Sequence, residues 1–126
     1  MVKSMAASLQ FYTNGLGFNM KQSWTPDGSI RWCWLEQGGA ALMLQEFWSD
    51  GRHAVTIPEK LGAGVGLNFQ CKDAIAFYHI AKERGIEAKR PFVGNHMWVT
   101  SLLDPDGYSL HFQSPTDVPE ETEYDQ

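Results

Sequence analysis

The chain repeats one pattern twice, and this internal duplication limits its possible folds more than any other feature. Phe11 and Phe77 lie 66 residues apart, and each is followed by a tyrosine in a segment whose apolar residues have helical spacing. Gly39 and Gly107 lie 68 residues apart, each in a turn signal between two short apolar runs. Such self-similarity predicts two βαβββ modules, which form an α+β domain made by duplication.

The repeat also sets the expected boundaries of the chain. A length of 126 residues is that of a single domain. We expect one domain over residues 1–126, with module one at about 1–47 and a connecting loop at about 48–62. Module two is expected at about 63–114 and an acidic tail at 115–126.

A strand is expected before each helix, but only the second copy shows one clearly. The segment AGVGLNFQC, residues 63–71, precedes the second helix, and the 66-residue spacing places Asn68 opposite Val2. The sequence therefore predicts a first strand that is truncated, or one whose true start lies upstream. Because unpaired strand edges are normally paired or covered, we also expect a homodimer.

The first hairpin is expected to turn at Gly38 and Gly39. Centring it there pairs Trp34 with Met43 and Trp32 with Gln45 across the two strands. These four side chains then lie on one face of the sheet.

The second hairpin is expected to turn within the segment DPDG, residues 104–107. Centring it between residues 106 and 107 pairs Leu102 with His111 and Thr100 with Gln113. This register places Thr100 on the same face as His111.

The pairings divide the strands into two faces. One face is apolar and is expected to lie under a helix; its members are Leu35, Leu42, Leu44, Leu67, Phe69, Val99, Leu103, Leu110 and Phe112. The other face mixes indole, amide, hydroxyl and imidazole groups, which is typical of small-molecule pockets. The candidate ligand-binding residues on it are Trp32, Trp34, Met43, Gln45, Asn68, Trp98, Thr100, His111 and Gln113.

Charge and composition exclude several classes of partner. Residues 1–113 carry ten basic and ten acidic side chains, and the rest of the chain adds five acidic ones. A neutral body with an acidic end argues against nucleic acid and anionic membranes as partners. We expect the acidic end to be solvated.

The sequence has no apolar run long enough for a membrane span and no signal-peptide pattern. Its two cysteines, Cys33 and Cys71, do not form a CxxC motif, so we expect reduced thiols rather than a disulfide or zinc knuckle. The expected location is therefore the cytoplasm.

Three segments carry a family resemblance: SLQFYTNGLGF at 8–18, GGAALMLQEF at 38–47 and DPDGYSLHFQSPTD at 104–117. With the paired βαβββ modules, they make the chain resemble the vicinal oxygen chelate superfamily, which contains glyoxalase I, bleomycin-resistance proteins and extradiol dioxygenases. The resemblance implies that a sheet from each module curves around a cavity. It also implies a homodimer.

The resemblance further implies four positions for metal ligands. They fall on a residue before Met1 and on Met43, Gly66 and His111. Of the residues present, only His111 offers a nitrogen, oxygen or thiolate ligand for a transition metal. We therefore expect no metal cofactor, and we interpret His111 as a hydrogen-bonding group in a pocket wall.

The favoured hypothesis is a metal-independent small-molecule binding protein of the bleomycin-resistance branch, whose ligand is aromatic or partly cationic. The expected stacking groups are Trp32, Trp34 and Trp98, and the orienting groups are Gln45, Asn68, His111 and Gln113. One alternative is a metal-dependent lyase, epimerase or dioxygenase that uses His111. Another is an interaction domain whose aromatic residues form a core or a dimer interface. The sequence identifies no catalytic residue.

Overall fold

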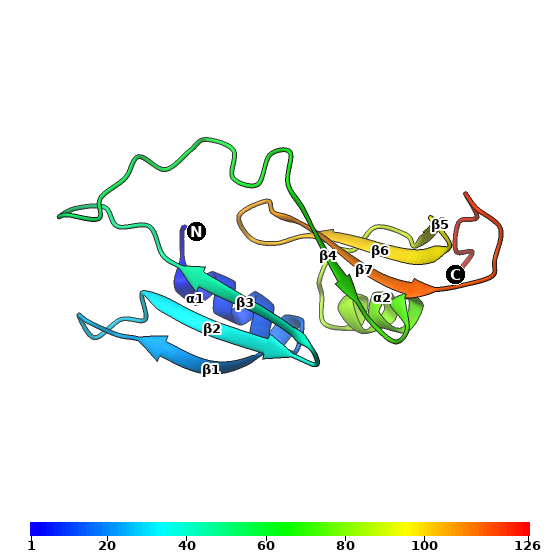
Figure 1. The fold of residues 1–126 in the computed structure, drawn as a ribbon, viewed down its shortest axis with the longest axis horizontal. Helices are drawn as coiled ribbons and strands as arrows, with labels where there is room; N and C mark the ends of the chain where they lie inside the picture. The colour runs from blue at the N-terminus through cyan, green and yellow to red at the C-terminus, as the bar shows by residue number, and fades with distance from the viewer. The chain divides into compact units, whose positions relative to one another are not determined.

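A computed structural model describes residues 1–126 and divides them into two compact units, Met1–Leu61 and Gly62–Gln126 (Figure 1). Each unit contains one helical segment and one open sheet. The fold is α+β, as the sequence predicted.

Unit 1 consists of a short helix and a three-stranded antiparallel sheet in the order β1-β2-β3. Its elements are α1 (Met5–Leu9), a π-helical continuation η1 (Gln10–Gly15), β1 (Asn19–Trp24), β2 (Trp32–Gln37) and β3 (Ala40–Gln45). Val2 lies beside the end of β3, where its N–H donates to the Gln45 carbonyl at 2.8 Å and its carbonyl accepts from the Phe47 N–H at 3.0 Å. Val2 therefore occupies the place of the strand expected before the helix.

Unit 2 has a four-stranded sheet in the order β4-β7-β6-β5. Its elements are β4 (Gly66–Gln70), α2 (Ala74–Glu83), β5 (Phe92–Gly94), β6 (Met97–Leu103) and β7 (Ser109–Pro115). Strand β4 pairs with β7 in parallel, and the other pairs are antiparallel. With Val2 in the place of β4, unit 1 has the same strand order.

The helix starts show how the two copies align. Asp73 caps α2, where its Oδ1 accepts the N–H groups of Ile75 and Ala76 at 2.9 Å, and Ser4 Oγ accepts the Ala7 N–H at 3.2 Å in α1. Both are side-chain N-caps.

The cap at Ser4 therefore corresponds to the cap at Asp73. Likewise, the Val2 and Cys71 N–H groups donate to the equivalent carbonyls of Gln45 and Gln113. Val2 thus corresponds to Cys71, and the expected match to Asn68 is wrong by three residues. A shift of about one helical turn leaves the apolar face unchanged, so the pattern of the helix could not reveal it.

The first hairpin has the predicted register. Trp34 lies opposite Met43 and Trp32 lies opposite Gln45. The two-residue loop contains Gly38 with a φ of +57°, a conformation that glycine adopts without steric cost.

The register predicted for the second hairpin is wrong by one residue. His111 lies opposite Ser101, and Thr100 lies opposite Phe112. The connection contains five residues, 104–108, and is held by Asp104, whose Oδ1 accepts the N–H groups of Asp106 and Tyr108 at 2.9 Å. Because side chains alternate along a strand, this shift exchanges the two faces of β6.

The corrected register changes the core of unit 2. Thr100 is fully buried and its Oγ1 donates to the Ala74 carbonyl of α2 at 2.7 Å. Phe112 stacks on Phe77 of α2 with ring centroids 3.9 Å apart. Leu103, expected in the core, is instead 58% exposed. The helix-covered face thus contains Thr100 and Phe112 and excludes Leu103.

In unit 1 the helical segment covers one face of the sheet, and Trp34 and Met43 lie on the opposite face. The main buried apolar residues of the unit are Val2, Met5, Tyr12, Leu16, Phe18, Cys33, Leu35 and Leu44. Met5 of α1 meets Cys33 of β2, with their sulfur atoms 3.9 Å apart. These contacts confirm the predicted placement of Leu35 and Leu44 under a helix.

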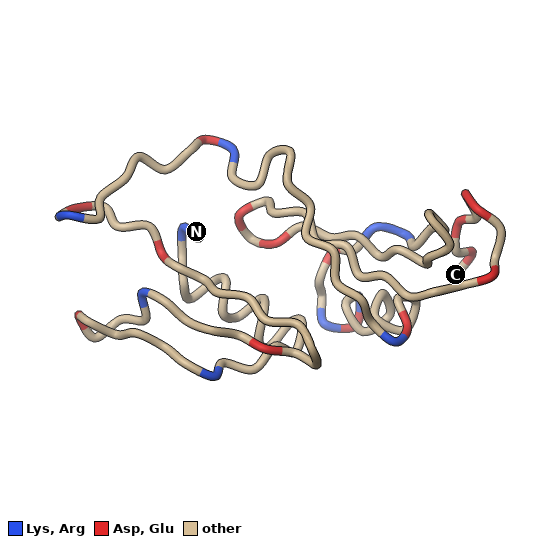
Figure 2. The backbone as a smooth tube through the Cα atoms, viewed as in Figure 1, with Lys and Arg blue, Asp and Glu red and all other residues tan.

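The acidic C-terminal segment keeps its five acidic side chains exposed to solvent, as expected, but it also packs against unit 2, which the sequence did not predict. Tyr124 Oη lies 3.1 Å from His79 Nε2 of α2, and the Tyr124 ring meets Trp98 edge-on at 6.1 Å. The Glu120 carboxylate accepts the N–H groups of Asn95 and His96 at the β5–β6 turn. Figure 2 shows these acidic positions along the C-terminal segment. Aromatic packing and backbone hydrogen bonds therefore hold the segment against unit 2.

No helix in the structure has the length and apolar character needed to cross a lipid bilayer.

Candidate functional site

The sheet of unit 1 has an aromatic face on the side away from α1. Trp32 and Trp34 stand on β2, opposite Gln45 and Met43 of β3. Met43 is 59% exposed, and the indole N–H of Trp34 donates to Glu36 Oε1 at 2.9 Å. The structure therefore brings together the four site residues that the sequence predicted in module one.

Strand β1 adds a further tryptophan that was not among the predicted site residues. Trp24 lies opposite Trp32 and is 46% exposed. The turn signal PDG at residues 26–28 could have revealed this pairing, since it separates the two strands. We define the aromatic face as Trp24, Trp32, Trp34, Met43 and Gln45.

Unit 2 has a polar face on the side of its sheet away from α2. The Gln70 amide donates to Gln113 Oε1 at 3.3 Å, and the Gln113 amide donates to Asn68 Oδ1 at 3.0 Å. This ladder leaves N–H groups of Asn68 and the carbonyl of Gln70 for other partners. We define the polar face as Asn68, Gln70, Ser101, His111 and Gln113.

The position of the His111 ring on the polar face is defined by Ser101 and Gly66. Its Nδ1 lies 2.8 Å from Ser101 Oγ. A Cβ atom at position 66 would lie 3.1 Å from His111 Nε2, so the absence of a side chain at Gly66 makes room for the imidazole. Ser101 was not predicted as a site residue because the expected register placed it on the opposite face.

Two predicted site residues are not on the polar face. Thr100 points toward α2, where it donates a hydrogen bond. Trp98 lies two residues before Thr100 on β6, so its side chain points to the same side of the sheet, and it contacts Tyr124. Asn68, His111 and Gln113 are on the polar face as predicted. The one-residue register shift explains both groups, because it moves β6 side chains and leaves those of β4 and β7 in place.

The residues present do not fit the metal site that the resemblance implies. Gly66 has no side chain, and Met43 offers only a thioether. His111 is then the one remaining ligand among these positions, and its Nε2 could form a single metal bond, since its Nδ1 contacts Ser101. No group of three or more His, Cys, Asp or Glu side chains in residues 1–126 is arranged to hold a metal ion. Transition metals require several nitrogen, oxygen or thiolate ligands, so this donor set does not suit them.

The two cysteines are also unsuited to nucleophilic chemistry. Burial raises the pKa of both Cys33 and Cys71 above the usual thiol value. A raised pKa keeps the thiol protonated, and the thiolate is the reactive form.

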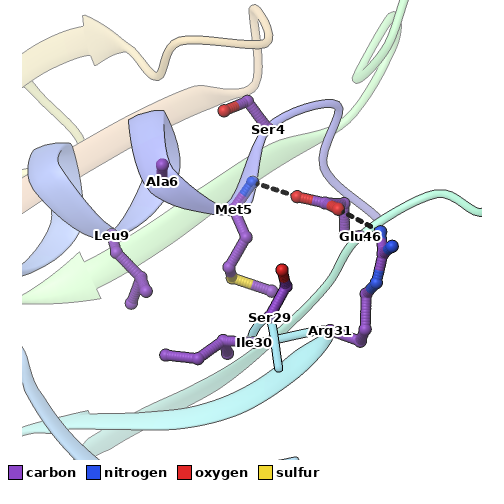
Figure 3. A pocket seen from close by; sticks show the side chains of 8 residues that line it. All are labelled: Ser4, Met5, Ala6, Leu9, Ser29, Ile30, Arg31 and Glu46. Atoms are coloured by element: carbon purple, nitrogen blue, oxygen red, sulfur yellow. Dashed lines mark hydrogen bonds and ion pairs between the residues drawn. The ribbon is translucent and has the colours of Figure 1, made fainter. Parts of the chain in front are cut away.

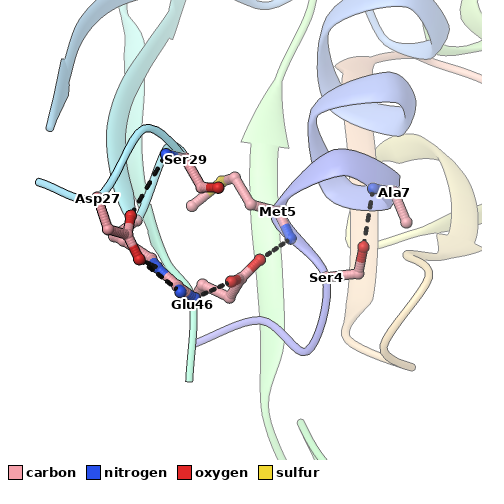
Figure 4. Close-up of polar contacts among 7 residues, drawn as sticks. Ser4, Met5, Ala7, Asp27, Ser29 and Glu46 are labelled. Atoms are coloured by element: carbon pink, nitrogen blue, oxygen red, sulfur yellow. Dashed lines mark hydrogen bonds and ion pairs between the residues drawn. The ribbon is translucent and has the colours of Figure 1, made fainter. Parts of the chain in front are cut away.

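A pocket of about 410 Å³ lies at the start of α1 in unit 1 (Figure 3). Its lining residues are Ser4, Met5, Ala6, Leu9, Ser29, Ile30, Arg31 and Glu46. Glu46 Oε2 accepts the Met5 N–H at 2.6 Å (Figure 4). Arg31 binds both Glu46 and Asp27. The pocket is confined to unit 1, and none of its lining residues belongs to the aromatic face.

Comparison with known proteins identifies the family. The family model that matches residues 1–112 is that of the Glyoxalase/Bleomycin resistance protein/Dioxygenase superfamily. No curated protein matches the chain.

Solved structures share the fold at low sequence identity. TnmS3, an antibiotic binding protein from Streptomyces sp. CB03234, is 20% identical, with a TM-score of 0.70 over 91% of this chain and 89% of that one. A glyoxalase/bleomycin resistance protein from the same Streptomyces strain is 22% identical, with a TM-score of 0.69 over 90% and 93%. Lactoylglutathione lyase from Agrobacterium tumefaciens is 14% identical, with a TM-score of 0.65 over 89% and 86%. Together with the duplicated fold, the match over residues 1–112 shows that the chain belongs to the glyoxalase/bleomycin resistance protein/dioxygenase superfamily, also called the vicinal oxygen chelate superfamily.

Proposed function

We propose that this protein binds an aromatic or partly cationic small molecule without a metal, and that the aromatic face is its stacking surface. The observation that carries the proposal is the row of Trp24, Trp32 and Trp34 beside the exposed Met43. Indole rings stack on planar ligands and attract cations, and Met adapts its shape to them. The antibiotic-binding neighbour TnmS3 supports a small-molecule ligand for this fold.

We propose the polar face as a second surface that orients ligands by hydrogen bonds. The chain of amide hydrogen bonds leaves the N–H groups of Asn68 and the side-chain carbonyl of Gln70 available to a ligand. His111 lies on the same face, and its ring contacts Ser101. Neutral groups of this kind recognise polar groups of a ligand without requiring a charge.

The test is a fluorescence titration of the purified protein with planar aromatic compounds, some of which carry an amine. We expect binding to quench or shift tryptophan fluorescence, and we expect EDTA to leave the affinity unchanged. Elemental analysis of the same sample should show less than one transition-metal ion per chain. One tightly held ion per chain, with binding or turnover lost in EDTA, would instead support a metal-dependent enzyme that uses His111.

Ser101→Ala tests whether Ser101 positions His111. The substitution removes the hydroxyl that lies 2.8 Å from His111 Nδ1, so we expect the NMR signals of the His111 ring to shift. For a ligand that contacts His111, the affinity should fall about three- to tenfold, on the scale of one hydrogen bond. Ser101→Thr retains the hydroxyl and is expected to restore both properties. Unchanged His111 ring signals in Ser101→Ala would contradict this role.

We also propose that the protein forms a homodimer. Strand β4 is one edge of the four-stranded sheet, whereas the other edge, β5, is covered by the C-terminal segment through Val93, Glu121 and Thr122. An edge strand favours pairing with another chain. Sedimentation velocity at micromolar concentration should show a dimer, and a monomer over the whole concentration range would refute the proposal.

A further inference from the structure

We propose that the pocket at the start of α1 is a separate binding site for a small organic amine with an apolar body. Its volume of about 410 Å³ lies within the range of small-molecule sites. All of its lining residues belong to unit 1, and none belongs to the aromatic face. The inference therefore goes beyond the proposed function and does not depend on it.

The inner wall of the pocket is apolar. Met5 is buried, and Leu9 and Ile30 are each partly exposed. Figure 3 shows these three side chains on the α1 and β2 sides of the pocket. Filling this wall with hydrocarbon would remove apolar surface from water, which is the main source of affinity for a small apolar body.

The rim of the pocket is polar and held in place. The Arg31 Nε and Nη2 atoms donate to Asp27 at 3.1 and 2.8 Å, and its Nη1 donates to Glu46 at 2.5 Å. Arg31 also lies over the Trp48 ring, 4.7 Å from its centroid. Figure 4 shows the carboxylates of Asp27 and Glu46 joined through these contacts. A rim fixed by its own contacts loses little conformational freedom when a ligand binds.

The charged group at the pocket consists of Arg31 and Glu46, which line it, and Asp27, which binds Arg31 from outside the lining. Two carboxylates and one guanidinium give the group formed by Asp27, Arg31 and Glu46 a net negative charge. The hydrogen bond from Arg31 lowers the pKa of Asp27, and the same contact raises the pKa of Arg31, so both stay ionised near neutral pH. Glu46 Oε2 accepts one N–H from Met5, and a carboxylate oxygen can accept a second donor. Because Asp27 already compensates the charge of Arg31, the Glu46 carboxylate can bind an ammonium group, and a ligand carboxylate has a weaker attraction to the pocket.

The test uses hexylamine as the probe, with hexanol and hexanoate as neutral and anionic controls of the same chain length. Titration of the intact protein, followed by ¹H–¹⁵N NMR, should move the amide signals of Met5, Ala6 and Arg31. We expect hexylamine to bind at least about tenfold more tightly than either control, a difference that one charge-assisted hydrogen bond can supply. Equal or tighter binding of hexanoate, or no shift at these residues, would overturn the proposal.

Two matched variants locate the binding. Ala6→Trp places an indole at the pocket, whereas Ala7→Trp makes the same change at the next exposed helix position, which does not line the pocket. We expect hexylamine binding to be lost in Ala6→Trp and retained in Ala7→Trp, with thermal unfolding used to check that both fold. Retention of binding in a folded Ala6→Trp variant would refute the assignment.

One further variant separates this site from the aromatic face. Trp34→Ala alters the proposed stacking surface and should leave hexylamine binding to the pocket unchanged. If Trp34→Ala abolishes the hexylamine shifts at Met5 and Ala6, the amine binds at the aromatic face and the pocket proposal is wrong. Failure of the pocket would leave the proposed function intact, because the latter is measured with planar aromatic compounds.

Discussion

Leu110→Ala is expected to lower the free energy of unfolding by about 2–5 kcal/mol, whereas Leu103→Ala should lower it by less than about 1 kcal/mol. Leu110 is fully buried on the α2 side of the sheet, while Leu103 is 58% exposed. Removing the buried side chain leaves a cavity, and removing the exposed one does not. Urea unfolding followed by circular dichroism measures both values.

This pair is a direct test of the second hairpin. The two substitutions are chemically identical, and both residues lie next to the same five-residue loop, so their difference reports on burial. The register expected from the sequence placed both leucines in the core, whereas the structure places only Leu110 there. Equal destabilisation by the two variants would contradict the observed pairing of Ser101 with His111.

Trp34→Ala is expected to weaken ligand binding by about 1–3 kcal/mol, which corresponds to roughly five- to 150-fold in Kd. Trp34 lies beside Met43 on the aromatic face, so its ring is available for stacking. The measurement is the fluorescence titration with planar aromatic compounds described above. The variant should also lose part of the fluorescence change on binding.

Leu44→Ala serves as the matched control on the opposite face of the same hairpin. Leu44 is 5% exposed under the helical segment, so its truncation should destabilise folding by about 2–5 kcal/mol. The folded variant should keep the affinity of the native protein. If Trp34→Ala destabilises the fold as much as Leu44→Ala does and leaves binding unchanged, the aromatic face is structural and the proposed function is wrong.

The sequence by itself determined the duplicated α+β fold and the complete site pairing of the first hairpin. The helical spacing of apolar residues predicted both helices, and the adjacent Gly38 and Gly39 predicted the centre of a two-residue loop. Both signals are local: a helix period or a tight turn is encoded in neighbouring residues. The residue pattern alone therefore suffices to place Trp32 and Trp34 on one face with Met43.

The tertiary structure decided the features that depend on contacts between distant residues or on side-chain hydrogen bonds within a loop. Asp104 holds a five-residue loop through its carboxylate, which sets the register that joins Ser101 to His111 and moves Thr100 under α2. Tyr124 packs on His79 and thereby holds the C-terminal segment against unit 2, a contact that the acidic composition of the segment did not predict. Composition and periodicity report average preferences, whereas the number of residues in a loop and the partner of one aromatic ring are fixed only when the chain folds. A single such contact can reverse a whole face, because alternate residues of a strand point in opposite directions.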